Sequence, residues 1–535
     1  MPISRSGSDF DAILVSAEYW DDHPLCPVGV IARVLDADGF SVGIIEKPVK
    51  DEDFTKLGAP KLFFGVTSGS IDSMLNNYTP LKRPRKDDPH ADWNEMPDRA
   101  VVAYCNALRR LFKGCKIAIG GIEASLRRFA HYDYWDNAVR RSILLDTRAD
   151  VLVYGSGEKQ AAEIARRLKG GKELDGIRGT CAMAKEPPEG FTVIHSYETV
   201  KEDKTKFCEM QMAFSNERAL AQAHGQRFVV QHPAPEYSPE DLDAIYALPF
   251  SRAMHPKSQL RMAQFSVATH RGCVGECSFC SLALHQGNRI VSRGEESILR
   301  EIESMTRHPD FKGHIDDLGG PSANMYGMDC EAVCEGSRDG DAVTAGRRHC
   351  ISCANLDKSH SRLVALMRRA RAVPGVKKVF VRSGVRYDLA IESREYVREL
   401  SQHHVSGTLK IAPEHFSKRV LKLMGKPGDR FSEFCDLFNS LNKDTGQTLR
   451  YYFMVGHPGD DVQEANELAR RAAKLGNAEQ FQLFTPTPMS LSTCMYWTGL
   501  DPRTMEPVKV VYDFATKKRM KTAMSKALDS APRSG

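Results

Sequence analysis

Short apolar segments alternate with segments of helical periodicity along most of this chain, and this alternation limits its fold more than any other feature. The candidate strands in the first 160 residues are FDAILVSA, SVGIIE, KLFFGVTSG, KIAIGG and DVLVYGSGE. The last three run into turns that contain Gly or Ser, which is typical of strand–loop–helix crossovers in a parallel sheet. Helices are expected over PVGVIARVLDADGF and over residues 98–113 and 136–145. We therefore predict an α/β protein with a doubly wound domain over residues 1–160.

The alternation resumes near residue 262 and continues to about residue 500. It contains six strand–helix units, which is the size of a partial (β/α)6 barrel, and the functional side chains of such barrels lie at the carboxyl ends of the strands. We predict this barrel over residues 262–500. Residues 161–261 are predicted to be a connecting region, first helical, with ETVKEDKTKFCEMQMAFSNERALAQAHG as one long helix, and then rich in Pro. Residues 501–535 are predicted to be a short basic tail.

Three cysteines follow the first predicted strand of the barrel, in the segment SVATHRGCVGECSFC. Cys273, Cys277 and Cys280 have the spacing Cys-x3-Cys-x2-Cys, which places three thiolates on one loop. Three thiolates can bind three irons of a [4Fe–4S] cluster, and the fourth iron is then open to another ligand. Two simpler interpretations are a zinc site completed by His270 or His285, and three reduced cysteines. The position directly after a barrel strand favours the cluster.

The cysteine count also bears on the compartment. The N-terminal segment MPISRSGSDFDAILVSA has no apolar core of signal-peptide length, and no apolar run is long enough to cross a bilayer. Fourteen cysteines in such a chain indicate a reducing compartment, where thiols bind metals or take part in redox chemistry. We therefore expect a cytoplasmic protein with no membrane partner.

The charge balance says little about partners. The net charge is +5, from 74 basic and 69 acidic residues, which is too small to indicate nucleic-acid binding. Basic runs such as residues 82–86 could contact phosphates, but each is more typical of a solvated face, and Asp87 and Asp88 offset this one. No separate RNA-binding domain is found, so a nucleic-acid partner has no support in the sequence.

The cysteine spacing, with Phe279 before the last cysteine and a barrel strand before the loop, resembles the radical S-adenosylmethionine (SAM) superfamily. The segments DHP, GGIEASLRRFAHYDYW, LGGPSANMYGMDC, LKIAPEH, VLKLMGKP and LFTPTPMSLSTCMYWTG together resemble the YgiQ-like family, and the resemblance extends to about residue 515. Members of that family pair an N-terminal α/β domain with a radical SAM barrel and commonly extend further at the C-terminus.

The resemblance implies an activity. It places a [4Fe–4S] cluster on Cys273, Cys277 and Cys280 and makes SAM the second cofactor. Such an enzyme cleaves SAM reductively to a 5′-deoxyadenosyl radical, which abstracts hydrogen from a substrate. Reduced flavodoxin or ferredoxin would be the electron donor. The resemblance names neither the substrate nor catalytic residues beyond the cofactor ligands.

The resemblance also indicates where SAM would be contacted. Gly319 and Gly320 stand where the superfamily has a Gly-Gly-Glu turn at the SAM amino group, but the next residue here is Pro321, so the acidic contact is either missing or supplied by Asp316 or Asp317. Phe279 and Gly456 are expected near the adenine. The polar candidates near strand ends for the SAM carboxylate, the ribose or the substrate are Arg382, Arg386, Lys410, Glu414 and His415.

A second set of cysteines lies after the second predicted barrel strand. Cys330, Cys334, Cys350 and Cys353 form two close pairs separated by a polar, Gly-rich stretch. This arrangement is typical of a zinc site or of a second cluster, and the alternative is two unrelated reduced pairs.

The N-terminal domain resembles the cobalamin-binding modules that precede some radical SAM barrels. The base-off signature Asp-x-His-x-x-Gly is matched at Asp21 and at His23, the candidate axial ligand, but Cys26 occupies the glycine position. Because a glycine there lets the corrin ring approach the backbone, we expect cobalamin to be unlikely and favour a vestigial module or a substrate-docking domain, in which His23 caps the next helix. Whether cobalamin binds stays open.

Two rival functions stay open. An enzyme of the same superfamily could methylthiolate RNA or protein with an auxiliary cluster on the second cysteine set. A protein of another class would be a non-catalytic metal-binding or iron-sensing module. The sequence indicates neither the oligomeric state nor the product.

Overall fold

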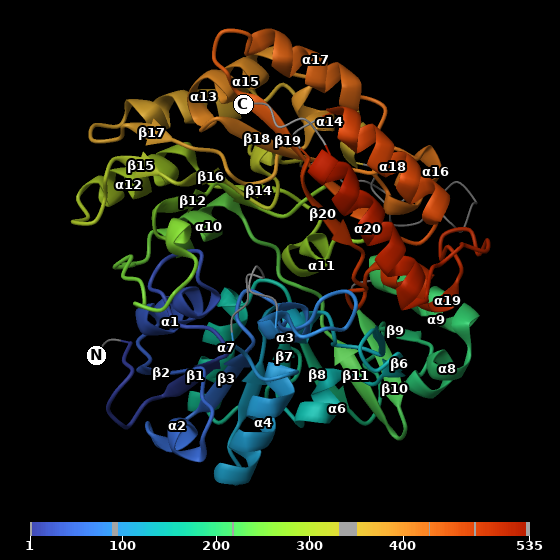
Figure 1. Cartoon of the computed structure of the whole chain (residues 1–535). Helices are drawn as coiled ribbons and strands as arrows, with labels where there is room; N and C mark the ends of the chain where they lie inside the picture. Colours follow the sequence, from blue (N-terminus) through green and yellow to red (C-terminus); the bar gives the residue numbers. More distant parts are fainter. Residues whose placement is uncertain are drawn as a thin grey trace. The chain divides into compact units, whose positions relative to one another are not determined.

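The computed structural model, shown in Figure 1, describes residues 3–87, 95–216, 219–330, 350–426, 428–475 and 478–530. The chain divides into two compact units. The first unit comprises Met1–Glu236, Leu248–Gln264 and Thr487–Met489. The second unit comprises Tyr237–Ala247, Phe265–Pro486 and Ser490–Gly535. Among the described residues, no helix is long and apolar enough to cross a membrane.

The first unit is built on a nine-stranded sheet with the strand order β2-β1-β3-β4-β7-β8-β11-β10-β9. These strands are β1 (Ala12–Ser16), β2 (Val42–Glu46), β3 (Phe63–Thr67), β4 (Ile117–Ile119), β7 (Val151–Val153), β8 (Thr180–Ala184), β9 (Thr192–Ile194), β10 (Leu220–His224) and β11 (Arg227–Gln231). The first five strands in this order are parallel. Strand order reverses between β1 and β3, so their carboxyl ends form the switch point of a doubly wound sheet. The predicted α/β class is confirmed.

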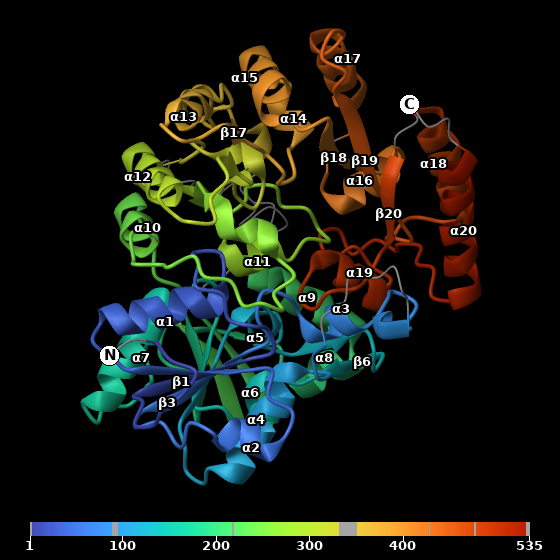
Figure 2. The same cartoon turned by 60° about the vertical axis from the view of Figure 1, so that its left-hand side comes forward.

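Helices cover both faces of the parallel part of this sheet (Figure 2). On one face α1 (Pro27–Ala37) packs against α7 (Glu158–Lys169), and on the other α4 (Ala100–Leu111) contacts α2 (Asp51–Thr55) and α6 (Ile143–Thr147). All five residues of β1 are buried, because a parallel strand covered on two faces has no solvent side. The predicted helices that end near Gly39 and over 98–113 correspond to α1 and α4.

The helix predicted over residues 136–145 is wrong. The structure has a hairpin of β5 (His131–Asp133) and β6 (Ala138–Arg140), followed by the short α6. The Asp133 carboxylate accepts the backbone N–H of Trp135 at 2.9 Å and of Asp136 at 3.0 Å. An aspartate that bonds the backbone two and three residues ahead closes a turn, and this turn replaces the first turn of the expected helix.

Residues 161–261 also differ from the predicted connecting region, because they add four strands, β8 to β11, to the sheet. The expected long helix divides into α8 (Tyr197–Glu202), α9 (Lys204–Asn216) and β10. Asp203 separates the two helices, since its carboxylate accepts the N–H of Thr205 and of Lys206. This capping contact starts a new helix rather than continuing the old one.

The second unit contains the predicted alternation of parallel strands and helices. Its parallel pairs are β12 (Ser266–Ala268) with β16 (Asp317–Gly319), β15 (His314–Ile315) with β17 (Lys378–Val379), and β18 (Thr408–Glu414) with β19 (Thr448–Val455) and then β20 (Ala478–Leu483). Two further backbone hydrogen bonds link neighbouring segments, one from Leu318 N–H to Phe380 O and one from Val381 N–H to His404 O. The intervening helices are α12 (Glu295–Thr306), α13 (Ser361–Ala372), α15 (Arg394–Glu399), α16 (Lys418–Met424), α17 (Phe431–Leu441) and α18 (Val462–Leu475).

The C-terminal segment is not a simple tail. Within it α20 (Phe514–Ser530) packs on α18 and β20, as Figure 1 shows. Met520 and Met524, one helical turn apart, are fully buried. This i, i+4 apolar pair gives the helix a packing face that its lysines and arginines obscure in the sequence.

The Asp21-Asp22-His23 segment ties the loop after β1 to residues 251–258 of the same unit. The Asp22 carboxylate accepts the N–H of Ser251 at 2.9 Å and its hydroxyl at 2.6 Å, and it pairs with Arg33 on α1. The Asp21 carboxylate accepts the His255 N–H and the Ser258 hydroxyl, both at 2.6 Å. Burial raises the pKa of Asp22, but the bonds from Arg33 and Ser251 outweigh this effect and hold its pKa below the ordinary value.

We expect Asp22→Ala to lower the free energy of unfolding by about 3 kcal/mol, because it removes a buried carboxylate that bonds Ser251 and Arg33 and leaves the half-buried Arg33 with only Asp36, at 3.6 Å. Since the pKa of Asp22 is lowered by folding, its contribution is present above the unfolded pKa, near pH ~4, and is lost as the pH falls through the folded pKa. Urea denaturation followed by circular dichroism measures both effects. Asp51→Ala, which removes an exposed partner of Arg110, is the control and should cost much less. Equal losses in the two variants would contradict the structural role of Asp22.

Candidate metal centre

Backbone hydrogen bonds fix both ends and the middle of the Cys273–Cys280 loop. The loop follows β12 and the short β13 (His270–Arg271) and leads into α11 (Leu282–Gln286). Cys273 N–H donates to Gly287 O at 3.1 Å, and Cys280 N–H donates to Cys277 O at 3.0 Å. Ser278 joins two distant elements, because its N–H donates to Met424 O at 2.8 Å and its carbonyl accepts from Ser492 N–H at 2.9 Å. The positions of the three thiols are therefore set before any ligand binds.

The three thiols lie close enough to influence one another. Burial raises the pKa of Cys280 to about 12, and the neighbouring Cys277 and Cys273 add to this rise. Burial likewise raises the pKa of Cys273, with a further contribution from Cys277. All three cysteines are free of disulfides and only partly buried. Such a cluster of thiols becomes favourable when a metal takes the place of their protons.

The chemistry of the donor set fits a [4Fe–4S] cluster, because the loop presents three thiols and each cysteine of such a cluster binds a different iron. His270, which was considered as a zinc ligand, is buried and bonds Thr269 Oγ1 through Nδ1 at 2.9 Å.

Arg386 lies on the cysteine side of the site. Its Nη1 is 3.4 Å from Cys277 Sγ and 3.4 Å from Gly275 O. Its Nε and Nη2 donate to the two carboxylate oxygens of Asp388, at 3.0 and 2.5 Å. With all three nitrogens engaged, this guanidinium faces a thiol rather than an open position for a SAM carboxylate.

The glycines at the end of β16 allow close packing. A Cβ at Gly320 would lie 2.5 Å from His270 Cε1, and one at Gly319 would lie 3.2 Å from Ser383 Oγ. Asp317, one candidate for the missing acidic contact, accepts the N–H groups of Arg382 and Ser383 and the Ser383 hydroxyl. Asp316 lies 3.6 Å from the Arg382 guanidinium. The Asp317 carboxylate is therefore used in hydrogen bonds to residues 382 and 383.

An aromatic group borders the cysteine loop. The Phe279 ring meets His457 edge-on at 6.3 Å, and His457 meets Phe484 at 5.1 Å. Burial lowers the pKa of His457 to about 3, so the ring is neutral, and its Nε2 lies 2.6 Å from Ser492 Oγ. The adjacent Gly456 has a φ of 75° and donates its N–H to Asp460. His457 was not singled out from the sequence, although it stands directly after Gly456 in VGHPGD.

The structure brings some of the polar candidates to this loop and leaves others apart. Glu414 ends β18 with a φ of 65°, pairs with Lys426 at 3.1 Å, and is close enough to Cys280 to raise its pKa. A left-handed conformation at a non-glycine residue is strained and is common at functional sites. Lys410, by contrast, is exposed on β18, with its Nζ 5.9 Å from the Tyr452 ring. His415 is buried, 3.6 Å from Asp460.

One cysteine of the second set and one of the first share an apolar cluster. Cys350 and Cys273 pack against the same apolar cluster, which consists of Val274, Ile290, Met325, Met328, Leu356 and Leu389. Cys353 N–H donates to Cys350 O at 3.1 Å, the same turn that closes Cys277–Cys280, and Asn355 N–H donates to Cys353 Sγ at 3.4 Å. Cys334 lies outside the described residues.

His23, the candidate axial ligand of cobalamin, lies in the loop after β1. It is buried, its Nδ1 accepts the Leu25 N–H at 3.2 Å, and its Nε2 is 3.9 Å from Asp21 Oδ2. Burial lowers its pKa to about 4. Cys26, at the glycine position of the signature, is the N-cap of α1 and is also buried. Both ring nitrogens of His23 thus face groups of the protein.

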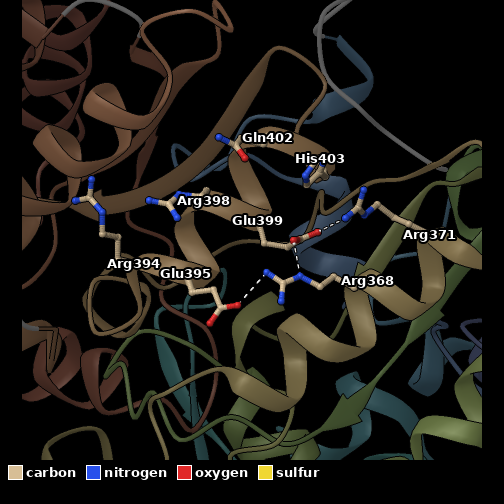
Figure 3. Close-up of a pocket in the computed structure, with 8 residues that line it drawn as sticks. All are labelled: Arg368, Arg371, Arg394, Glu395, Arg398, Glu399, Gln402 and His403. Carbon is tan, nitrogen blue, oxygen red and sulfur yellow. Dashed lines mark hydrogen bonds and ion pairs between the residues drawn. The ribbon is translucent and has the colours of Figure 1, made fainter.

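A separate cavity of about 560 Å³ lies between α13 and α15 (Figure 3). It is lined by Arg368, Arg371, Arg394, Glu395, Arg398, Glu399, Gln402 and His403. Arg368 and Arg371 share Glu399, at 3.0 and 2.8 Å, as the dashed lines in Figure 3 mark. None of the cysteines lines this cavity, so it is not part of the candidate metal centre.

Comparison with known proteins assigns families to the chain. Residues 3–268 match the family described as Radical SAM N-terminal, residues 267–472 match the Radical SAM superfamily, and residues 479–531 match a domain of unknown function. A UPF0313 protein of Clostridium botulinum (strain Okra / Type B1) is 44% identical over 96% of this chain and 84% of the relative. A UPF0313 protein of Methanocella arvoryzae is 44% identical over 94% of this chain and 87% of the relative.

Two solved structures are similar in fold. The radical SAM methyltransferase TsrM from Kitasatospora setae, with cobalamin and a [4Fe-4S] cluster bound, has a TM-score of 0.53 and 16% identity over 91% of this chain and 78% of that chain. The cobalamin-dependent radical SAM enzyme OxsB, with aqua-cobalamin bound, has a TM-score of 0.50 and 12% identity over 91% of this chain and 55% of that chain. The expectation against cobalamin gains no support from these neighbours.

These matches confirm the resemblance to the radical SAM superfamily and the YgiQ-like family. Membership of the superfamily makes the protein an enzyme with a [4Fe–4S] cluster and SAM as cofactors. The chain therefore belongs to the UPF0313 family of radical SAM proteins.

Proposed function

We propose that Cys273, Cys277 and Cys280 ligate the [4Fe–4S] cluster and leave one iron for SAM, and that the enzyme abstracts hydrogen from an organic substrate. The observation that carries this proposal is that the three thiols stand on one loop fixed by backbone hydrogen bonds, in which Gly275 donates its N–H to Cys273 Sγ and its carbonyl accepts from Cys277 Sγ, each at 3.4 Å. When bound and reduced, the cluster supplies the electron that cleaves SAM to methionine and a 5′-deoxyadenosyl radical.

The surrounding residues would position SAM and exclude water. Phe279 and Gly456 are proposed to border the adenine, and Gly319 and Gly320 to let the backbone approach the SAM amino group. Glu414 is proposed as a polar contact, because it lies near Cys280. The apolar cluster that packs against Cys273 shields that side of the loop from water. Lys410 lies apart from this group and is not proposed as a SAM contact.

The electron must come from outside the chain. Reduced flavodoxin or ferredoxin is proposed as the donor, because reduction of the cluster needs one electron at low potential and both carriers supply single electrons at low potential. The substrate class is left open.

A second metal centre near the first is a further candidate. The specific observation is that Cys350 packs against the same apolar cluster as Cys273 and that Cys350–Cys353 forms the same closed turn as Cys277–Cys280. A second cluster there could exchange electrons with the first or hold substrate, as methylthiolation would require. A zinc ion would only order the segment.

We expect the anaerobically reconstituted protein to form 5′-deoxyadenosine from SAM and dithionite, and Cys277→Ala to reduce the rate about 100-fold or more. Changes outside the ligand sphere already cost about 10–100-fold at metal sites, so loss of a ligand should cost more. Cys115→Ala, at another partly exposed cysteine in the first unit, is the control and should match wild type. Wild-type rates in Cys277→Ala would refute the proposed ligand set.

Counting bound metal separates the interpretations of the second cysteine set. One cluster corresponds to about four iron and four sulfide per chain, and two clusters correspond to about eight of each. If a second cluster is present, the wild type binds about eight irons per chain, and Cys350→Ser and Cys353→Ser should each lower this number toward about four. Both variants should still form 5′-deoxyadenosine at a measurable rate. Wild-type protein with about four irons and one zinc supports a structural zinc site, and four irons without zinc contradict any second centre.

A further inference from the structure

A buried ion pair touches the proposed cluster loop. Arg386 is the N-cap of α14 (Tyr387–Ala390), and Asp388 lies in the first turn of that helix. Arg386 is 7% exposed and Asp388 is 9% exposed. The guanidinium gives two donors to Asp388 and turns the third toward Cys277 Sγ and Gly275 O. The pair therefore has a positive end at a thiol and a negative end away from it.

The backbone of Arg386 is clamped from a neighbouring strand end. Arg386 N–H donates to Asn324 Oδ1 at 2.8 Å, and Asn324 Nδ2 donates back to Arg386 O at 3.0 Å. Asn324 is fully buried and also lies 3.2 Å from His360 Nε2. This reciprocal pair fixes the backbone at the start of α14, and the two bonds from the guanidinium to Asp388 hold the side chain beside Cys277.

Stability alone does not account for this pair. Desolvating two charges costs several kcal/mol per ion, and an apolar pair of similar volume is often as stable. Because a guanidinium is not deprotonated in proteins, Arg386 carries its positive charge at every working pH. A permanent cation is thus kept within hydrogen-bond reach of a thiol at considerable desolvation cost.

We propose that Arg386 and Asp388 set the reduction potential of the cluster that Cys277 ligates. Reduction adds one negative charge to the cluster, and hydrogen bonds and nearby charge at its sulfurs are known determinants of potential. Arg386 stabilises the reduced cluster, and Asp388 limits this effect by neutralising part of the arginine charge. The inference rests on the proposed function, since it requires a cluster at Cys277, and it assigns Arg386 to the cluster rather than to the SAM carboxylate.

The test is a redox titration of the reconstituted full-length protein followed by electron paramagnetic resonance, with iron and sulfide measured first. Arg386→Gln removes the cation and should make reduction at least tenfold less favourable, which is about 59 mV toward negative potential for a one-electron couple. Asp388→Asn keeps the cation and removes its counter-charge, so its potential should move in the opposite direction. Arg503→Gln is the matched control, because Arg503 makes the same bidentate pair, at 2.7 and 2.8 Å, with Asp501 two residues away, and makes no described contact with a cysteine.

Opposite shifts in the two variants, with the control unchanged, would establish the proposal. Unchanged potentials, or shifts of the same sign, in protein that carries the cluster would overturn it. If Arg386→Gln does not bind a cluster, the direction of the potential shift in Asp388→Asn tests the proposal alone. If neither variant binds a cluster, the pair is needed for cluster assembly, and the proposed role in setting the reduction potential is overturned. A wild-type protein without a cluster would instead refute the proposed function, so the two failures are distinguishable.

Discussion

The fixed position of the Cys273–Cys280 loop is the constraint on which the candidate site depends. Ser278, in the middle of the loop, bonds Met424 at the end of α16 and Ser492 at the start of α19 (Leu491–Thr498). Each such bond contributes about 1 kcal/mol net, but together they remove the conformational freedom that three thiols on a mobile loop would lose on binding a cluster. The site is thus preorganised by residues that lie more than a hundred positions away in the sequence.

The polar groups around this loop have separate tasks. Arg386 and Asp388 place charge beside Cys277, whereas Phe279, the neutral His457 and Phe484 form a wall without charge. A charged side and an uncharged side suit a centre that must accept an electron and also bind a cofactor with an aromatic base. The N-terminal unit has a different character. In that unit, Asp21 and Asp22 tie the loop after β1 to residues 251–258.

Local patterns predicted much of this architecture, and long-range contacts explain what they missed. The cysteine spacing and the strand that precedes it are local, and so are the apolar periods of α1 and α4. Of the four added strands, β8 pairs with β7 and with β11, and β9 pairs with β10, so these pairings join segments that are separated in the sequence and that no local pattern specifies. The hairpin at residues 131–140 forms because Asp133 caps its turn, and this contact outweighs helical propensity.

In the candidate site, too, local patterns predicted some features and long-range contacts determine the others. Cys273, Cys277 and Cys280 could be singled out because their spacing alone places them on one loop. Arg386 could be singled out as polar near a strand end, but its orientation depends on Asn324, 62 residues earlier. Asp388 and His457 carry no sequence signal of their own, because a lone acidic residue or histidine is common on any helix or strand end.

The most direct test of the central claim is the electron paramagnetic resonance spectrum of the reconstituted, dithionite-reduced protein with and without SAM. If three cysteines hold the cluster and one iron is open, the reduced protein gives the spectrum of a [4Fe–4S] cluster, and SAM changes its g values because it binds that iron directly. A cluster spectrum that SAM leaves unchanged, or no cluster spectrum at all, would contradict the account.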